Sequence, residues 1–135
     1  MKKVLFVCVE NAGRSQMAEA FAKKYGANKF TVSSAGNKPA EKVNPAVVEV
    51  MKEKGIDLSS KIPELITAKM AQEADLIVTM GCTDQGICPG PFFKPTINWA
   101  VEDPKGKSIE KVREIRDEIE RKVKQLLSQQ TIVGT

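Results

Sequence analysis

The 135-residue chain contains no histidine, and it has only one tryptophan, one tyrosine and three cysteines. The absence of histidine excludes every mechanism that needs an imidazole base, including Ser-His-Asp and Cys-His nucleophile pairs. It also removes a common ligand of zinc and haem. Any catalysis must therefore use cysteines, carboxylates, arginine, lysine, hydroxyl groups or backbone amides, and we expect neither a cofactor nor a metal site.

Long apolar runs and concentrated charge are missing as well. No stretch approaches the roughly 20 apolar residues needed to span a bilayer, and the apolar run at residues 4–9 is too short for a signal peptide. Lys and Arg total 21 against 17 Asp and Glu, with both signs mixed along the chain. A nucleic-acid interface usually shows a basic stripe or aromatic platforms. We therefore expect a cytoplasmic protein that binds neither membrane nor nucleic acid.

Strand and helix patterns alternate along the chain. Apolar runs rich in β-branched residues are typical of strands buried on both faces, and the candidates are residues 4–8, 30–33, 75–80 and 96–101. Helical spacing and capping patterns predict helices over residues 15–25, from Pro45 to Gly55, and from Ser108 onward. The alternation predicts an α/β fold in which one four-stranded parallel sheet carries helices on both faces. We expect a single domain over residues 1–130 and a frayed tail over 131–135.

The first strand-to-helix turn is the place to look for a site, because ligands of such sheets bind where strands end and helices begin. This turn reads Cys8-Val9-Glu10-Asn11-Ala12-Gly13-Arg14-Ser15. A tight loop before a helix can turn its backbone N–H groups inward and cradle an oxyanion, and the planar guanidinium of Arg14 can hold two oxygens. The candidate substrate-binding residues are Asn11, Gly13, Arg14 and Ser15.

Cys8 is the candidate nucleophile of this loop. Inward N–H groups and the charge of Arg14 favour a thiolate, the form that a nucleophile without a histidine base requires, and Ser15 can donate its hydroxyl to it. The alternative is a cysteine that merely fills a buried strand end. The order of strand, Cys-x5-Arg-Ser and helix favours the nucleophile. The loop lacks the glycine patterns of nucleotide-binding and dinucleotide-binding motifs.

Cys82 and Cys88 flank a short segment within residues 81–95, a stretch rich in Gly and Pro that follows the third predicted strand. Three thiols without imidazole do not complete a closed zinc site unless carboxylates join them, and a structural disulfide is not expected in a reducing compartment. The alternative to a functional pair is two unrelated surface cysteines. Further on, Asp103-Pro104 is a common turn pair before a helix, but Asp103 is also a natural proton donor in a chain without histidine.

The Cys8–Ser15 loop resembles that of the low-molecular-weight protein tyrosine phosphatase fold family, and within it the thioredoxin-coupled arsenate reductases. The likeness covers nearly the whole chain, in order, through Gln16-Met17-Ala18-Glu19, Ser34-Ala35-Gly36, Asn44-Pro45, Gly55-Ile56-Asp57, residues 74–79, Cys88-Pro89, Trp99 and Asp103-Pro104. The resemblance implies a phosphatase-like fold, and the two downstream cysteines favour the reductase branch.

The resemblance also implies a mechanism. Cys8 would attack arsenate, Asp103 would protonate the departing oxygen, and Cys82 and Cys88 would relay a disulfide to thioredoxin or a similar thiol reductant. The first alternative is a phosphatase that hydrolyses phosphomonoesters through a phosphocysteine, using Cys8, Arg14 and Asp103 alone. The second is a non-enzymatic oxyanion- or phosphoprotein-binding module.

Two positions bear on the choice of substrate. In phosphatases of the family an aromatic residue commonly follows the Asp-Pro pair, whereas here Lys105-Gly106 follows, which suits a small inorganic oxyanion better. Glu10 stands where many family members have glycine. A carboxylate that faced the anion would repel arsenate, so we expect Glu10 to point away from it.

Overall fold

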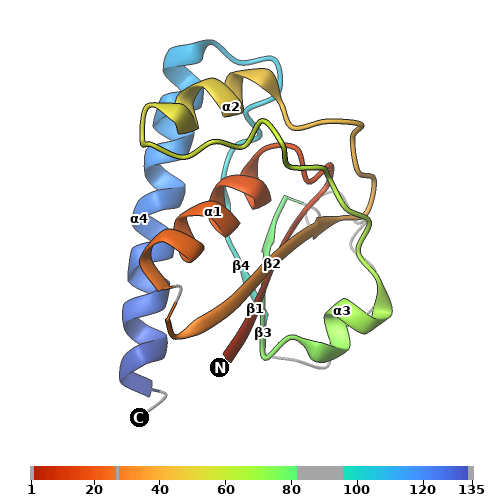
Figure 1. Ribbon diagram of the computed structural model, residues 1–135, viewed down its shortest axis with the longest axis vertical. Helices are drawn as coiled ribbons and strands as arrows, with labels where there is room; N and C mark the ends of the chain where they lie inside the picture. Colours follow the sequence, from red (N-terminus) through yellow and green to blue (C-terminus); the bar gives the residue numbers. More distant parts are fainter. Residues whose placement is uncertain (1, 27, 82–95, 134–135) are drawn as a thin grey trace.

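A four-stranded parallel sheet forms the centre of the protein in the computed structural model, which describes residues 2–26, 28–81 and 96–133 (Figure 1). The strand order is β2-β1-β3-β4, so the first strand is central. The strands are β1 (Lys2–Cys8), β2 (Phe30–Gly36), β3 (Leu76–Met80) and β4 (Thr96–Asn98).

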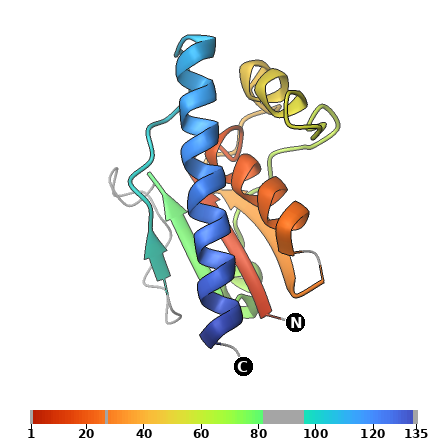
Figure 2. The ribbon, with the colours of Figure 1, turned by 90° about the vertical axis from the view of Figure 1, so that its left-hand side faces the viewer.

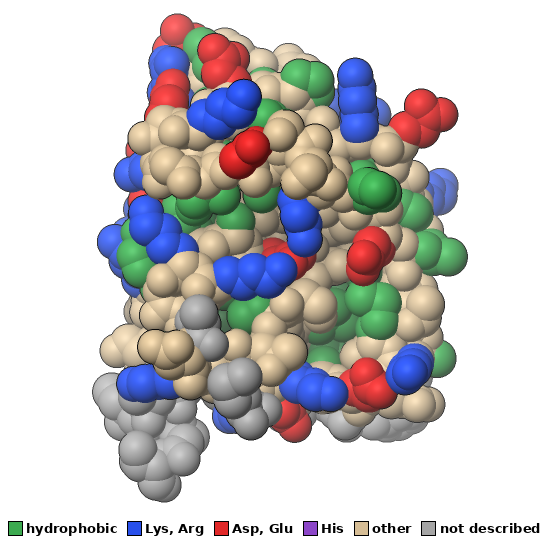
Figure 3. Space-filling view, in the orientation of Figure 1, with side chains coloured by type: hydrophobic (Ala, Val, Ile, Leu, Met, Phe, Trp, Pro, Cys, Tyr) green, Lys and Arg blue, Asp and Glu red, His purple; other side chains and the backbone are tan. Residues whose placement is uncertain are grey.

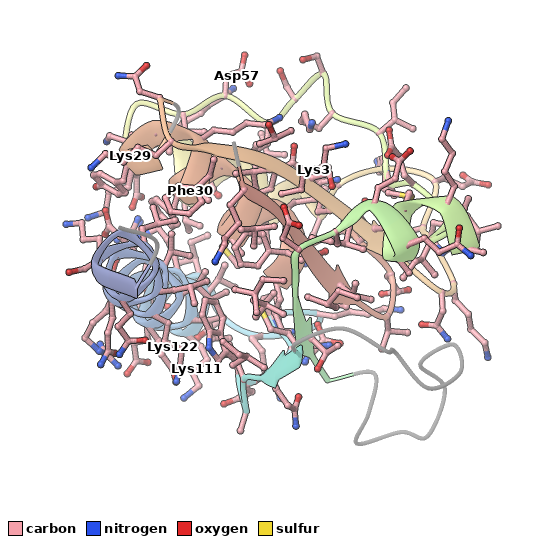
Figure 4. The ribbon with its side chains drawn as sticks, turned by 90° about the horizontal axis from the view of Figure 1, so that it is seen from below. Lys3, Lys29, Phe30, Asp57, Lys111 and Lys122 are labelled. Carbon is pink, nitrogen blue, oxygen red and sulfur yellow. The ribbon has the colours of Figure 1, made fainter. Side chains whose placement is uncertain are left out.

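Helices cover both faces of this sheet. The helices are α1 (Arg14–Gly26), α2 (Pro45–Lys52), α3 (Ala68–Glu73) and α4 (Ile109–Val133). α1 and α4 pack together on one face with α2 beside α4, and Figure 2 shows α4 running along this side of the molecule. α3 lies across the sheet from α4, as the view from below makes clear (Figure 4). The predicted fold class is confirmed.

The alternation of side chains along β1 explains why its sequence is apolar throughout. Val4, Phe6 and Cys8 face the larger core under α1, α2 and α4, whereas Leu5 and Val7 face a smaller core on the α3 side. Both sets are almost fully buried. Cys8 therefore ends a strand that is fixed from both sides.

The observed elements differ from the predicted ones at several points. α3 was not predicted, because its six residues include no buried side chain and hence no apolar stripe; its start is capped by the Thr67 hydroxyl, which accepts from Met70 N at 3.1 Å. β4 ends at Asn98 rather than at residue 101. α4 runs from Ile109 to Val133.

The surface carries charges of both signs. On the face seen in Figure 3, basic and acidic side chains are interspersed, and neither sign forms a large patch of its own. Within the described ranges, none of the helices combines the length and apolar character that crossing a membrane requires.

Candidate active site

Cys8 lies at the carboxyl edge of the sheet, in its centre. In the parallel register it aligns with Gly36 at the end of β2 and with Met80 at the end of β3. The chain passes from β1 to β2 on one side and later to β3 on the other, so the loop after β1 leaves the sheet at a topological switch point. This is where open α/β sheets bind ligands.

The loop between β1 and α1 is closely packed from outside. Its carbonyl oxygens accept backbone hydrogen bonds from the segment after β2, in the pairs Lys38 to Val9, Ala40 to Glu10 and Asn44 to Ala12, at 2.9, 3.0 and 2.8 Å. Because these carbonyls point outward, the loop leaves N–H groups for the interior, beside the N-terminus of α1. That is the arrangement of an oxyanion cradle.

The sulfur of Cys8 contacts the Ser15 hydroxyl, at 2.9 Å between Sγ and Oγ. Both residues are buried. The Asn11 amide donates to the same hydroxyl oxygen at 2.6 Å, so the Ser15 proton is available for the sulfur. A hydroxyl that donates in this direction stabilises a thiolate.

Asn11 holds the loop together from behind. It has a positive φ of 52°, a conformation that asparagine adopts more readily than most residues. Its fully buried side chain also donates to Ser34 Oγ at 3.0 Å and accepts from Gln16 Nε2 at 3.1 Å and from Glu64 N at 2.9 Å. These bonds direct the side chain of Asn11 to the loop, so any contact with an oxyanion would come from its backbone.

This polar network continues to a buried carboxylate, Glu19. Ser34 Oγ donates to Glu19, and the ammonium groups of Lys23 and Lys61 lie 2.5 and 3.2 Å from its Oε2. Burial alone raises the pKa of Glu19, but the hydrogen bonds from Lys23 and Ser34 and the charges of Lys23 and Lys61 outweigh it and hold that pKa below its usual range. Glu19 is therefore ionised in the folded protein at neutral pH.

Replacing Glu19 by glutamine should lower the free energy of unfolding by about 2 kcal/mol at pH 7, because the two lysines and the Ser34 hydroxyl lose a charged acceptor. Since folding lowers the pKa of Glu19, its contribution is fully present above the ordinary glutamate pKa of about 4.3 and is lost as the pH falls through the folded value. Urea unfolding of both proteins at pH 7 and pH 3 should show the difference shrinking in acid. Glu114→Gln, at an exposed position of α4, is the control and should show little effect at either pH.

Arg14 is buried, and it contacts two segments that are distant from it in sequence: residues 101–103 and Gly81. Its Nη1 donates to the Val101 carbonyl at 3.0 Å, and its Nη2 lies 3.7 Å from Asp103 Oδ2. Gly81, with a φ of +89°, packs against the guanidinium so closely that a Cβ there would lie 2.3 Å from Nη1. A glycine is required at this position both by the backbone conformation and by the close approach.

Asp103 belongs to a turn that rests on the Cys8 loop. Its Oδ1 accepts from Lys105 N at 3.0 Å, and its side chain is about half exposed, at 49%. Pro104 covers Gly13: a Cβ at position 13 would lie 2.8 Å from Pro104 Cγ. Gly13 therefore allows the turn to sit directly over the loop.

These elements surround one pocket with a volume of about 340 Å³. Of the residues singled out in the sequence, Cys8, Gly13, Arg14 and Asp103 line it together. The Ser15 hydroxyl contacts the Cys8 sulfur that lines the pocket. Asn11 is not among its lining residues, and Cys82 and Cys88 lie outside the described residues.

Two lysines also line the pocket. Lys42 and Lys105 line it, from the segment after β2 and from the Asp103 turn. Lys105 follows the Asp103-Pro104 pair that the sequence singled out, whereas Lys42 lies in no basic run or motif, so only the fold brings it near Cys8. Glu10 lines the pocket too, contrary to the expectation that it would point away, and its Oε2 lies 3.2 Å from Lys105 Nζ. The ion pair compensates the carboxylate that would otherwise face an anion.

The model of the family described as low molecular weight phosphotyrosine protein phosphatase matches residues 3–133. The chain belongs to this family. A curated relative, the arsenate reductase of Brevibacillus brevis, is 41% identical over 91% of this chain and 92% of its own length. The arsenate reductase of Bacillus cereus strain ATCC 14579 is 37% identical with the same coverage of both chains. The family resemblance inferred from the sequence is thereby confirmed.

Solved structures show the same fold in family members named for different reactions. The thioredoxin-dependent arsenate reductase of Corynebacterium glutamicum superposes with a TM-score of 0.83 at 34% identity; the match covers 98% of this chain and 63% of that one. The YwlE arginine phosphatase superposes with a TM-score of 0.85 at 29% identity, over 96% and 95% of the two chains. The fold alone therefore does not choose between a reductase and a phosphatase.

Proposed function

We propose that this protein reduces arsenate to arsenite, with Cys8 as the nucleophile. The observation that carries the proposal is the pocket in which the Cys8 sulfur, bonded by the Ser15 hydroxyl, is joined by Arg14 and Asp103. The names of the curated relatives support arsenate as the substrate. The pocket is also bordered by a lysine rather than by an aromatic ring after the Asp-Pro pair, which suits a small inorganic oxyanion.

The first step joins sulfur to arsenic. The arsenate binds to the inward N–H groups of the loop and to Arg14, as anions bind at helix N-termini and to guanidinium groups. The Cys8 thiolate attacks the arsenic, and one arsenic–oxygen bond breaks. Asp103 supplies a proton, so that the oxygen leaves as water rather than as hydroxide.

The second stage transfers two electrons through thiols. The Cys82 thiolate attacks the Cys8 sulfur, the electron pair of the sulfur–arsenic bond goes to arsenic, and arsenite leaves. Cys88 then attacks Cys82, which releases the Cys8 thiolate and forms a Cys82–Cys88 disulfide for thioredoxin or a similar dithiol to reduce. Three reduced thiols of this kind fit a cytoplasmic protein.

Two features of the described residues support a relay through Cys82. The register aligns Cys8 with Met80 at the end of β3, and Gly81 packs against Arg14. Cys82 is the next residue in the sequence. The chain that carries it therefore leaves the sheet at the edge where the nucleophile lies.

Replacing Cys82 by serine should abolish arsenate reduction in the presence of thioredoxin, because the sulfur–arsenic bond then has no attacking thiolate. The measurement is NADPH oxidation by thioredoxin and its reductase, with and without arsenate. The same variant should still bind arsenate and should keep any hydrolysis of an aryl phosphate, which needs only Cys8, Arg14 and Asp103. Arsenate-dependent NADPH oxidation that persists in the variant would rule out the relay.

A phosphatase is the second candidate, and one comparison favours it. The arginine phosphatase superposes as well as the arsenate reductases do, and the pocket holds every group that a phosphocysteine mechanism needs. If the wild-type protein hydrolyses phosphomonoesters but shows no arsenate-dependent NADPH oxidation, this candidate replaces the first.

A further inference from the structure

Glu10 and Lys105 form an ion pair across the pocket, and nothing in the proposed reaction uses them. Glu10 belongs to the loop that follows Cys8, and Lys105 belongs to the turn that carries Asp103. Their charged atoms lie 3.2 Å apart, with one-third of the Glu10 side chain and 70% of the Lys105 side chain exposed. Ninety-five residues separate the two in sequence, so the pair joins the two catalytic segments directly.

The Asp103 turn has few other attachments to the Cys8 loop. Pro104 rests on Gly13, and Asp103 lies 3.7 Å from Arg14, beyond hydrogen-bond distance. Lys105 N–H donates to Asp103 Oδ1, so the backbone at Lys105 and the carboxylate of Asp103 form one unit. A contact that restrains Lys105 therefore restrains Asp103 as well.

We propose that the Glu10–Lys105 ion pair positions Asp103, by holding its turn over the Cys8 loop. The inference rests on the proposed function, because it assigns Asp103 the role of proton donor. Glu10 and Lys105 are positioning residues, since both act through Asp103. Lys105 has two effects in this arrangement. It holds the turn, and its positive charge cancels the negative charge of Glu10 beside the anion site.

The two single neutral variants, Glu10→Gln and Lys105→Gln, separate these two effects. Both break the ion pair, so both should lower the maximal rate of arsenate-dependent thiol loss in a single turnover about two- to fivefold, the range that an exposed ion pair allows. The arsenate concentration at half-maximal rate should move in opposite directions. It should fall in Glu10→Gln, which removes a repelling charge, and rise in Lys105→Gln, which exposes one.

The charge-swapped double variant, Glu10→Lys with Lys105→Glu, restores an attraction between the same two segments. It should regain most of the wild-type maximal rate, which neither single variant does. Because the Debye length falls to about 3 Å at 1 M salt, the advantage of wild type over Glu10→Gln in maximal rate should shrink as salt is added. Lys107→Gln is the matched control: Lys107 lies 3.3 Å from Glu102 on the same segment, and its loss should leave the maximal rate unchanged.

A second measurement needs no turnover. Backbone order parameters of Lys105 and Gly106 from NMR relaxation should fall in both single variants and recover in the double variant. If wild type reduces no arsenate, the proposed function fails, but the order parameters still decide whether the pair holds the turn. Unchanged maximal rates and unchanged order parameters in both single variants would overturn the inference, as would a double variant that behaves like the worse single variant.

Discussion

Replacing Arg14 by lysine should lower kcat/KM for arsenate by about 10²- to 10³-fold, the effect of losing one preorganised donor at a developing oxyanion. A lysine keeps the positive charge but presents no planar pair of donors to the anion. It also cannot reproduce the bond to the Val101 carbonyl while facing Asp103, because the guanidinium makes both contacts from separate nitrogens. Steady-state kinetics with thioredoxin, over a range of arsenate concentrations, measures the change.

Arg116 provides a matched control for that variant. It is equally buried, donates to the Val50 carbonyl of α2 at 2.9 Å and lies 2.7 Å from Glu53, the residue that follows α2. Neither of these residues lines the pocket. Arg116→Lys should lower the melting temperature and leave kcat/KM unchanged. If Arg14→Lys retained more than a tenth of the wild-type kcat/KM, the assignment of Arg14 as the oxyanion clamp would be wrong.

Replacing Gly36 by alanine should have the largest effect on stability. The new Cβ would lie 2.5 Å from the Val9 carbonyl oxygen and 2.9 Å from Asn11 N, and both are backbone atoms of the Cys8 loop that no rotamer change can move. Relief of this contact should cost about 3 kcal/mol and lower the melting temperature by about 10 °C. Because the loop itself must move, arsenate reduction should fall with stability, which calorimetry and kinetics at 15 °C can separate.

The Gly55→Ala variant tests the other reason that a position can require glycine, which is a positive φ. Gly55 has a φ of +77° but open space around its Cβ position, so alanine there should cost only the left-handed strain of about 1 kcal/mol and should not change kcat/KM. If the Gly36→Ala protein were no less stable than the Gly55→Ala protein, the Cys8 loop and β2 could move apart without a loss of stability.

The placement of Cys8 and its neighbours could be predicted from the sequence because these residues are local. Cys8, Gly13, Arg14 and Ser15 lie in one turn, and the order of strand, loop and helix is enough to place them at the edge of a parallel sheet. Asp103 was predicted from the family resemblance, which implies a proton donor at this position, and the absence of histidine supported that role. These predictions depend on spacing and residue type, which the sequence contains directly.

The rest of the site could not be predicted, because it depends on contacts between distant segments. The side chain of Asn11 bonds Ser34 and Glu64 N rather than the pocket, and no pattern in the sequence pairs these residues. Lys42 reaches the pocket only through the fold. The expectation for Glu10 considered only the repulsion between its carboxylate and the bound anion. It did not include the ion pair with Lys105, which comes from another loop.

The central position of β1 in the sheet has a consequence for how the protein folds. β1 pairs with β2, the next strand, and with β3, which follows much later, as in the register of Val4 with Leu76. The guanidinium of Arg14 bonds the still later Val101 carbonyl. Parallel pairings of this kind give a high contact order, and such chains fold slowly compared with helical bundles. During synthesis Cys8 is therefore made well before the later segments that surround it. Refolding experiments should find activity returning only with the final folding phase.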